Sequence, residues 1–230
     1  MFERIQKLYS EEEFRKIQEL NVLLIGVGGV GGYTLEALIR SVITKITVID
    51  YDIFEISNIN RQILSTAVTL GKYKVEIAKQ RALQINPETK VEPINKKINK
   101  EDISLDLLKK YDIIVDECDD VGVKAKLLIE CAKNKINFIS CMGTGNRFQP
   151  ELLEILPLKK TQNDPLAKKI RHEVREYKEA LNMPVVCSKE IPIKAVGIGT
   201  CCPVPMAAGA LLASYVLKKE KLTSLKADIN

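Results

Sequence analysis

A glycine-rich segment directly after a short apolar run constrains the fold of this chain more than any other feature. The run Asn21-Val-Leu-Leu-Ile-Gly26 is typical of a buried parallel strand, and Gly26-Val-Gly28-Gly29-Val-Gly31 follows where a strand would turn into a helix. Glycines at such a turn let a phosphate approach the backbone amides, and the helix dipole there favours negative charge. The segment therefore predicts a nucleotide-binding α/β fold.

Strand-like and helix-like segments alternate through the first 141 residues. An amphipathic helix is expected over 11–20. Strands are expected over 21–26, 46–50, 89–93, 111–116 and 137–141, with helical faces over 35–42, 75–85 and 124–133 between them. This order predicts a doubly wound, Rossmann-like, mostly parallel sheet that binds its ligand at the carboxyl ends of the strands.

After Pro150 the alternation is looser, and we expect residues 157–190 to leave the sheet. This stretch carries eight basic and five acidic side chains. Asn163 or Asp164 can cap a helix that begins at Pro165, with a buried stripe and a basic, solvent-facing side. The stripe consists of Leu166, Ile170, Val174 and Tyr177, and the basic residues are Lys168, Lys169, Arg171 and Arg175.

The segment 195–217 carries no charged residue and is long enough to cross a bilayer. Its glycines, together with Pro203 and Pro205, divide it into a strand-like start and a helix-like end, so we expect a buried strand and helix and no membrane span. The six cysteines form no CxxC pair, and no apolar leader follows a basic start. These features favour a cytoplasmic protein with reduced thiols.

The glycine segment and Asp50 together indicate a nucleotide without identifying it. Asp50 ends the next expected strand, about twenty residues further on, where an acid can bind a ribose hydroxyl. NAD and ATP both fit this pattern, so an NAD-linked oxidoreductase stays open at this point.

Two further motifs favour ATP. Ser57-Asn58-Ile-Asn60-Arg61-Gln62 is followed by Gly71-Lys72-Tyr-Lys74-Val-Glu76. Cations such as Arg61 and Lys74 suit a triphosphate whose charge must be neutralised while a nucleophile attacks the α-phosphorus. Asp119, just past the strand over 111–116, would hold Mg²⁺ on the phosphates. Attack by a carboxylate would give an acyl-adenylate.

The order of these motifs resembles the ubiquitin-activating-like adenylating family of ThiF, MoeB and HesA over residues 4–142. The resemblance implies that Asp50 binds ribose, that Arg61 and Lys74 bind phosphates, and that Asp119 binds Mg²⁺. Asp52, Asn58, Asn60 and Gln62 would complete the nucleotide pocket. Arg4 resembles the amino-terminal arginine that dimers of this family insert into the neighbour's site, which implies a homodimer.

Within that family, members that activate sulfur carriers usually hold structural zinc through two CxxC pairs. This chain has none, so no structural zinc is expected. Its segments 142–146, 164–167 and 187–190 are similar to the tRNA threonylcarbamoyladenosine dehydratase branch, also called TcdA or CsdL. The resemblance implies Mg-ATP-dependent activation of the carboxylate of threonylcarbamoyladenosine beside the anticodon, followed by ring closure with loss of water.

The expected organisation is one ThiF-type domain over 1–230. Residues 1–150 form the nucleotide-binding core, and 151–230 face the substrate and support a dimer. The basic helix is a candidate tRNA contact, although a solvated face explains it equally well, and the net charge of +5 requires no acidic partner. Three matters stay open: a sulfur-relay partner, a catalytic role for Cys187, Cys201 or Cys202, and activation of a ubiquitin-like carboxyl terminus in place of tRNA.

Overall fold

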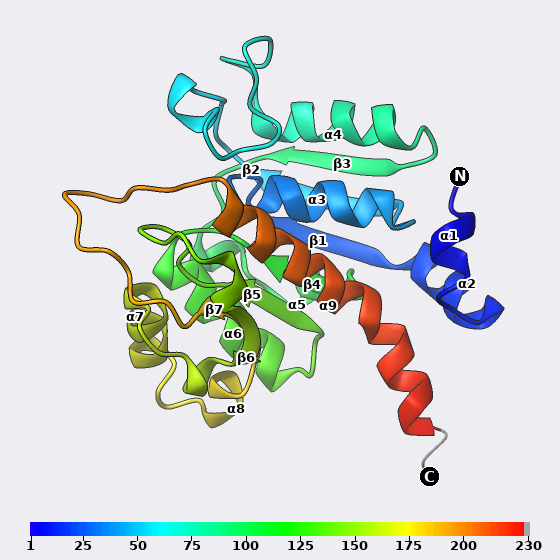
Figure 1. Ribbon diagram of the computed structural model, residues 1–230. Helices are drawn as coiled ribbons and strands as arrows, with labels where there is room; N and C mark the ends of the chain where they lie inside the picture. The colour runs from blue at the N-terminus through cyan, green and yellow to red at the C-terminus, as the bar shows by residue number, and fades with distance from the viewer. Residues whose placement is uncertain (228–230) are drawn as a thin grey trace.

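A seven-stranded sheet forms the centre of the computed structural model, which describes residues 1–227 and side chains as far as Lys218. Its strand order is β3-β2-β1-β4-β5-β7-β6, and only β6 runs antiparallel to its neighbour (Figure 1). The strands are β1 (Asn21–Ile25), β2 (Lys45–Asp50), β3 (Lys90–Asn95), β4 (Ile113–Asp116), β5 (Phe138–Cys141), β6 (Leu153–Pro157) and β7 (Pro184–Ser188). The doubly wound, mostly parallel α/β fold is thus confirmed.

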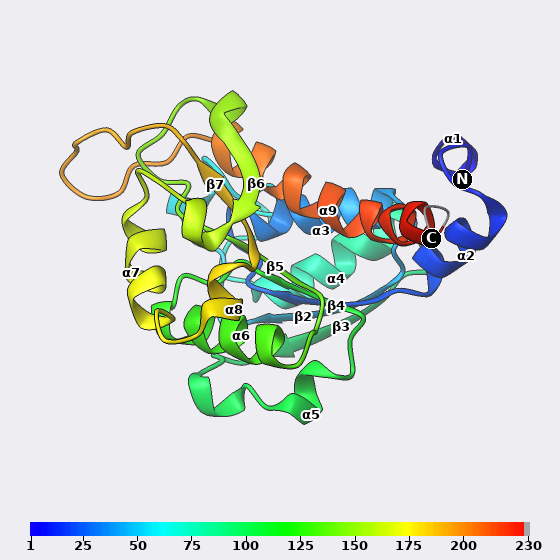
Figure 2. The same ribbon diagram turned by 90° about the horizontal axis from the view of Figure 1, so that it is seen from below.

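Helices cover both faces of the sheet, as Figure 2 shows. One face carries α3 (Gly31–Arg40), α4 (Lys74–Ile85) and α9 (Pro203–Ala227), with α1 (Glu3–Gln6) and α2 (Glu11–Glu19) at its edge. The other carries α5 (Leu105–Leu108), α6 (Val121–Lys133), α7 (Pro165–Glu173) and α8 (Lys178–Leu181). Short 3-10 turns are η1 (Ile56–Asn58), η2 (Lys100–Asp102), η3 (Pro150–Leu152) and η4 (Leu158–Lys160).

Strand β1 shows why its sequence is a continuous apolar run. Val22 and Leu24 pack in the core beneath α3, whereas Leu23 and Ile25 pack in the core against α6. Side chains alternate between the faces of a strand, so a strand covered on both faces needs apolar residues at every position. Burying each such side chain contributes roughly 1.5–3 kcal/mol.

The helices expected within the first 141 residues also form, with one local difference. Val42 was predicted on the apolar face of the helix after the glycine segment, but α3 ends at Arg40, and Val42 lies beyond it with φ 75°. Its side chain is still buried in the same core. The apolar pattern therefore identified burial correctly and the end of the helix two residues late.

The prediction that 157–190 leaves the sheet is wrong in part. Pro184–Ser188 forms β7, which lies between β5 and β6 in the sheet. The buried apolar run Val185-Val186-Cys187 is only three residues long, too short to give a strand-like alternation. Pro157 ends β6 on the outer edge of the sheet, where a residue without an amide hydrogen is tolerated.

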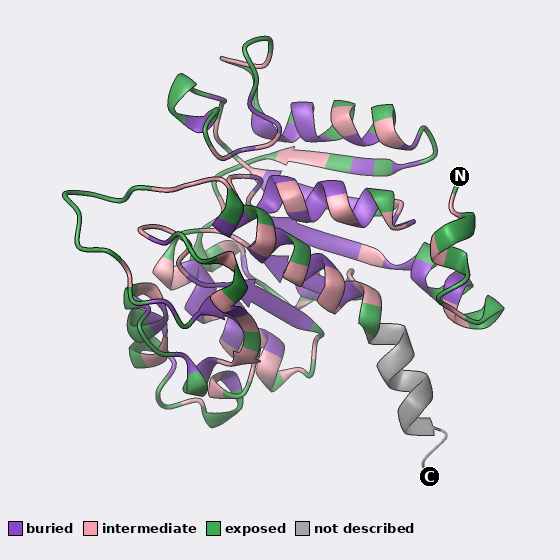
Figure 3. Ribbon diagram, viewed as in Figure 1, coloured by how far each residue is buried: buried purple, intermediate pink, exposed green. Residues whose placement is uncertain are grey.

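The predicted strand at the start of 195–217 is also wrong. Residues 189–202 form a loop, largely exposed in Figure 3, and Val196 and Ile198 on it are exposed. The helix-like end is α9, which is apolar because Val204, Ala208 and Leu212 pack in the core beneath it. Among the described residues, no helix combines the length and hydrophobicity needed to cross a membrane.

Candidate active site

A cavity of about 830 Å³ opens at the carboxyl ends of β1 and β4, the point where the strand order reverses. Doubly wound sheets bind ligands at this point, and small-molecule sites typically measure about 300–1,000 Å³. Of the predicted nucleotide site, Gly26, Gly28, Gly29, Asp50, Asp52, Asn58, Arg61, Gln62, Lys74 and Asp119 line the cavity. The fold therefore brings together motifs that lie up to 93 positions apart in the chain.

The four glycines have two different roles. Gly26 has φ 95°, and a Cβ there would lie 2.9 Å from the Glu117 carbonyl oxygen, while a Cβ on Gly31 would overlap the Gly26 carbonyl. Close backbone contacts therefore exclude a side chain at both positions. Gly26 lines the cavity and Gly31 does not. Gly28 and Gly29 face the cavity, where a Cβ would meet only ordinary contacts. Among the described residues no side chain caps the N-terminus of α3. The Gly32 and Tyr33 amides already donate to the Gly28 and Val30 carbonyls, so a phosphate would meet the loop amides that precede them.

Asp50 braces the glycine loop from the end of β2. Its Oδ2 accepts a hydrogen bond from the Val27 amide at 2.8 Å, and its Oδ1 accepts one from the Asp52 amide at 2.9 Å. An ionised carboxylate has about four acceptor positions, so Asp50 keeps free acceptor capacity beside the cavity. A ribose hydroxyl at Asp50 would therefore meet a carboxylate that is already held in place.

Lys74 and Arg61 supply positive charge from opposite ends of one segment. Lys74 begins α4 with its side chain almost fully buried, and its Nζ lies 3.0 Å from Oδ2 of Asp52. Arg61 donates to the Ser57 carbonyl at 2.7 Å and to Oδ1 of Asn60 at 3.0 Å. Among the described residues Arg61 forms no ion pair. Its charge is thus oriented by neutral groups.

The amide side chains of this segment differ in where they point. Asn60 does not line the cavity, because its Nδ2 donates to the Thr200 carbonyl at 2.9 Å. Asn58 is buried and accepts from the Glu55 amide at 3.1 Å. Gln62 is buried at the cavity, and its Oε1 has no hydrogen-bond partner among the described residues. A buried acceptor without a partner is costly, so Gln62 is suited to a ligand that donates a hydrogen bond.

The acidic segment after β4 has one carboxylate free for a metal. Asp119 is exposed and lines the cavity. Asp120 caps α6 by accepting from the Val123 amide at 2.8 Å, and Asp116 is buried in an ion pair with Lys124. In the part of the chain that is described, no three His, Cys, Asp or Glu side chains form a metal cluster. A Mg²⁺ ion at Asp119 would therefore depend on nucleotide phosphates for its other ligands.

Glu117 lies in the same segment, beneath the glycine loop. Burial raises the pKa of Glu117 to about 8, although the charge of Lys124 acts in the opposite direction. At neutral pH this carboxyl group is largely protonated, so it adds little negative charge near bound phosphates.

The cysteines near the cavity are poor nucleophiles. Burial raises the pKa of Cys118 and Cys141, which line the cavity, and burial raises the pKa of Cys187 to about 12. The thiolate is the nucleophilic form, so these three groups are disfavoured for covalent chemistry at neutral pH. Cys201 lies 3.1 Å from the Arg147 carbonyl, and Cys202 lies 2.8 Å from the Tyr33 hydroxyl.

Several cavity residues were missed at the sequence level. Lys96, Lys97 and Ile98 follow β3, and Thr144 follows β5. The Nζ of Lys97 lies 5.2 Å from the ring centroid of Tyr51. The signal was available, because the ends of parallel strands meet at one edge of the sheet. Residues after each expected strand were therefore candidates, whatever their type.

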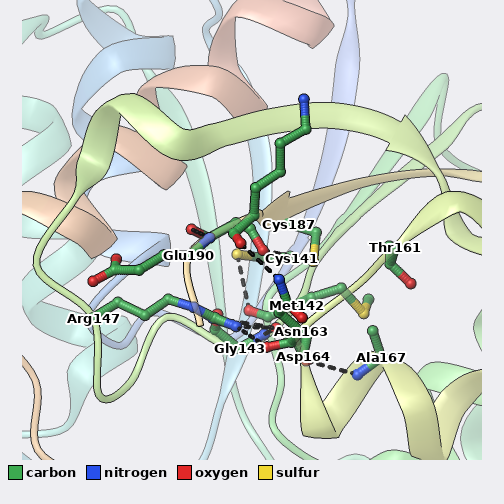
Figure 4. Close-up of polar contacts among 12 residues, drawn as sticks. Cys141, Met142, Gly143, Arg147, Thr161, Asn163, Asp164, Ala167, Cys187 and Glu190 are labelled. Atoms are coloured by element: carbon green, nitrogen blue, oxygen red, sulfur yellow. Dashed lines mark hydrogen bonds and ion pairs between the residues drawn. The ribbon is translucent and has the colours of Figure 1, made fainter. Parts of the chain in front are cut away.

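A buried ion pair fixes α7 beside the cavity (Figure 4). Asp164 caps α7 by accepting from the Ala167 amide at 2.7 Å, and it also accepts from the Gly143 amide at 3.0 Å. Arg147 forms an ion pair with Asp164 at 3.3 Å and donates to the Gly143 and Asn163 carbonyls. The sequence left the cap open between Asn163 and Asp164, and the structure places it at Asp164. Nothing in the sequence around Arg147 indicated its partner.

The basic residues predicted for α7 do not form a single exposed row, and Arg175 lies beyond the end of the helix. Lys168, Lys169 and Arg175 are exposed, and Lys169, with Pro165 and Leu166, lines the cavity. Arg171 is half-buried, and its guanidinium donates to the carbonyl and the hydroxyl of Thr161. The expectation that these basic groups lie largely on the solvent side holds for three of them, whereas Arg171 anchors the helix. The helix ends at Glu173, so Val174 and Tyr177 lie beyond it.

Arg4 lies on α1, exposed and outside the lining of the cavity. Figure 1 places α1 beside α2, at the opposite end of β1 from the glycine loop. Arg4 therefore does not contribute to the cavity of its own chain.

Comparison with known proteins supports the geometry of this site. The ThiF family model matches residues 3–219. A tRNA threonylcarbamoyladenosine dehydratase of Haemophilus influenzae is 39% identical over 175 residues, covering 76% of this chain and 67% of the relative. The protein of that name from Escherichia coli is 32% identical over 209 residues, covering 88% and 78%.

Solved structures agree over nearly the whole chain. The E. coli tRNA N6-threonylcarbamoyladenosine dehydratase TcdA, crystallised with AMP, matches with a TM-score of 0.92 at 30% identity, covering 98% of this chain and 95% of that one. The same enzyme crystallised with ATP also matches with a TM-score of 0.92. On these findings, the chain belongs to the ThiF family.

Proposed function

We propose that this chain uses Mg-ATP to adenylate the carboxylate of threonylcarbamoyladenosine in tRNA and then closes the modified base to a cyclic form. The observation that carries the proposal is the single cavity that joins the glycine loop, Arg61, Lys74 and Asp119 to the basic helix α7. The names of the similar proteins point to the same reaction.

Each part of the cavity fits a step in binding ATP. The loop amides before α3 and the charges of Arg61 and Lys74 would hold the phosphates, and Asp50 would hold the ribose. Asp119 would hold Mg²⁺ on the phosphates. The unpartnered Gln62 Oε1 and the uncapped N-terminus of α3 are the features of this chain that fit a bound nucleotide.

The proposed reaction has two steps. The substrate carboxylate attacks the α-phosphorus and pyrophosphate leaves, which gives an acyl-adenylate. A nucleophile within the same modified nucleoside then attacks the acyl carbon and AMP leaves, so the nucleoside loses one water in total. This route needs no cysteine, in agreement with the raised pKa values of Cys118, Cys141 and Cys187.

The rest of the chain suits this role. We propose that residues 1–150 form the nucleotide-binding core and that 151–230 contribute the substrate side and support a homodimer; residues 228–230 lie outside the described part. Lys168, Lys169 and Arg175 would meet tRNA phosphates. A homodimer would bring Arg4 to the neighbour's cavity. A cytoplasmic location suits an enzyme acting on tRNA, and a sulfur-relay protein is a further partner to test by copurification.

The test is to incubate the purified chain with Mg-ATP and tRNA carrying uncyclised threonylcarbamoyladenosine, digest it mildly and weigh the modified nucleoside. We expect an ATP-dependent loss of one water that Arg61→Ala and Asp119→Ala abolish without unfolding the chain. Lys72→Ala is the matched control, because Lys72 is an exposed residue in the same segment as Lys74. Near-normal turnover in both site variants would overturn the site assignment.

No loss of water, with ATP still bound, would direct the search to a protein carboxyl terminus as the substrate. A small partner ending in Gly-Gly would then copurify. Tight binding of NAD without competition by ATP would instead favour an oxidoreductase.

A further inference from the structure

The segment 142–146 was singled out in the sequence, and its last residue, Asn146, makes contacts that nucleotide binding does not explain. Asn146 has φ 57°, in the left-handed region that Asn tolerates better than most residues. It lies in the loop after β5, and four hydrogen bonds join it to the loop between β7 and α9.

Two of these bonds use the backbone of Asn146 and two use its side chain. Its amide donates to the Gly199 carbonyl at 2.7 Å, and its carbonyl accepts from the Ile193 amide at 2.8 Å. Its Oδ1 accepts from the Gly199 amide at 2.6 Å, and its Nδ2 donates to the Gly197 carbonyl at 3.2 Å. One residue therefore holds both arms of segment 191–200, which we call the crossing loop.

The crossing loop has little else to hold it. Ile191, Val196 and Ile198 are exposed, and Gly197 has φ 83° with open space around it. Its further tether at the cavity end is the bond from Asn60 to the Thr200 carbonyl. Without a core of its own, the loop takes its position from these few hydrogen bonds.

The crossing loop is also a wall of the cavity. Ile198 and Thr200 line it, together with Thr144, Leu166 and Lys169. A Cβ on Gly145 would overlap Cγ2 of Ile198, so the glycine before Asn146 allows the loop to lie against the segment after β5. This end of the cavity offers apolar side chains, two hydroxyl groups and one ammonium group, and the phosphate-binding residues lie on other loops.

We propose that Asn146 is a positioning residue whose hydrogen bonds, the clasp, hold the crossing loop at this end of the cavity. There the loop forms one wall of the site for the RNA nucleoside. The identity of the bound substrate as an RNA nucleoside rests on the proposed function. The clasp itself does not depend on it. Apolar walls suit the face of a base, and Lys169 suits the phosphate of a neighbouring nucleotide.

The test uses Asn146→Gly, which keeps the left-handed backbone and both backbone bonds and removes only the side-chain bonds. Asn146→Asp keeps the acceptor for the Gly199 amide and is expected to restore part of the loss. The matched control is Asn163→Gly. Asn163 also has a positive φ, 55°, and its side-chain Nδ2 donates to the Lys189 carbonyl at the root of the loop, outside segment 191–200.

Two readouts separate the clasp from the reaction. The first is the rate of trypsin cleavage after the exposed Lys194, followed by fragment mass. The second is the KM for threonylcarbamoyladenosine-containing tRNA. Since two hydrogen bonds are lost, Asn146→Gly should raise the cleavage rate and the KM for tRNA by about tenfold each. The kcat should stay within about twofold of the wild-type value, and the affinity for ATP should be unchanged. Asn163→Gly should change neither.

The outcomes distinguish the two proposals. If the wild-type chain does not dehydrate the tRNA, the proposed function fails, and cleavage after Lys194 still tests the clasp. If cleavage is unchanged in Asn146→Gly, the clasp is overturned. If cleavage rises while the KM for tRNA stays at the wild-type value in an active enzyme, the crossing loop is not a wall of the substrate site. The inference is then overturned.

Discussion

The Nζ of Lys124 lies 2.9 Å from Oδ2 of Asp116, and both side chains are almost completely buried. The Ser140 hydroxyl accepts from Lys124 and donates to Asp116, so the pair joins α6, β4 and β5. Burial lowers the pKa of Lys124, but the charge and the hydrogen bond of Asp116, together with nearby cysteines, outweigh that effect and the pKa is raised. Asp116, one member of this charged pair, therefore directly precedes the segment that carries Glu117 and Asp119.

Removing one member of this pair should destabilise the fold severely. Lys124→Met leaves the Asp116 carboxylate buried without its partner, which we expect to cost about 3–5 kcal/mol in urea unfolding. The double variant with Asp116→Asn should recover much of that loss. The control is Lys126→Met, whose ion pair with Glu130 is partly exposed and should contribute no more than about 1 kcal/mol. Equal losses for the two lysines would contradict this account.

The pairing of Lys74 with Asp52 separates charge from positioning at the cavity. Lys74→Met removes the cation that we propose binds the phosphates and should lower kcat/KM for dehydration by about 10²–10³. Asp52→Asn keeps the ammonium group and loses only its anchor, so we expect a smaller decrease. Lys72→Met should have little effect. If Asp52→Asn is as damaging as Lys74→Met, Asp52 itself contacts the substrate.

Neighbouring lysines on α7 give a sharp test of the tRNA surface. Lys169 lines the cavity and Lys168 does not, although both are exposed. Lys169→Glu should therefore weaken tRNA binding at moderate salt by roughly tenfold, more than Lys168→Glu, with ATP affinity unchanged in both. Arg171 is unsuitable for this test, because its guanidinium holds Thr161. Unchanged tRNA affinity in both variants would remove α7 from the interface.

Glu36 should make stability depend on acid pH. Burial alone would raise the pKa of Glu36, but hydrogen bonds from Arg81 and Arg40 outweigh it, so the pKa is lowered. A carboxyl group with a lowered folded-state pKa stabilises the fold above its unfolded pKa and loses that contribution as pH falls through the folded value. Glu36→Gln should therefore cost about 1–3 kcal/mol in the free energy of unfolding at pH 7.

That difference should shrink as the pH falls below about 4, near the ordinary pKa of a glutamate. Urea unfolding of both proteins across this range measures it. The control is Glu12→Gln, at an exposed ion pair with Lys16 on α2, which should show almost no difference. A constant difference between Glu36→Gln and wild type at all pH values would show that packing, not charge, sets the loss.

Mixing inactive subunits tests whether Arg4 acts on the neighbour's cavity. Arg4→Ala and Asp119→Ala are each expected to be inactive as homodimers. A mixed dimer would contain one site with its own Asp119 and an intact Arg4 from the partner, so activity should return on mixing. Dehydration of tRNA measures the recovery. Activity of Arg4→Ala alone would contradict a role for this residue.

The sequence predicted the nucleotide half of the fold well because β1, β2, β4 and β5 are apolar runs that do not depend on distant partners to be recognised. It predicted β7 poorly, because the local sequence around Val185 and Val186 carries no strand pattern. These residues become a strand by pairing with β5 on one side and with Leu156 and Ile155 on the other. In the same way, Asp164 was recognisable as a cap, whereas its partner Arg147 lies 17 positions away without a local signal. Arg171 was misplaced because charge alone does not show that Thr161 lies within its reach.

Gly26 has a consequence for when the chain becomes able to bind its ligand. Its amide donates to the Ile49 carbonyl, and its Cα lies against the backbone of Glu117, so the loop is complete only when β1 has paired with β2 and with β4. The pairing of Val22 with Ile113 closes a span of about ninety residues, the kind of distant contact that forms slowly. During synthesis, a chain that ends before β4 contains the glycines but lacks the Glu117 backbone that packs against them. A nucleotide can therefore stabilise this protein only after the central strands have assembled. It binds the complete sheet in preference to partly folded forms of the chain.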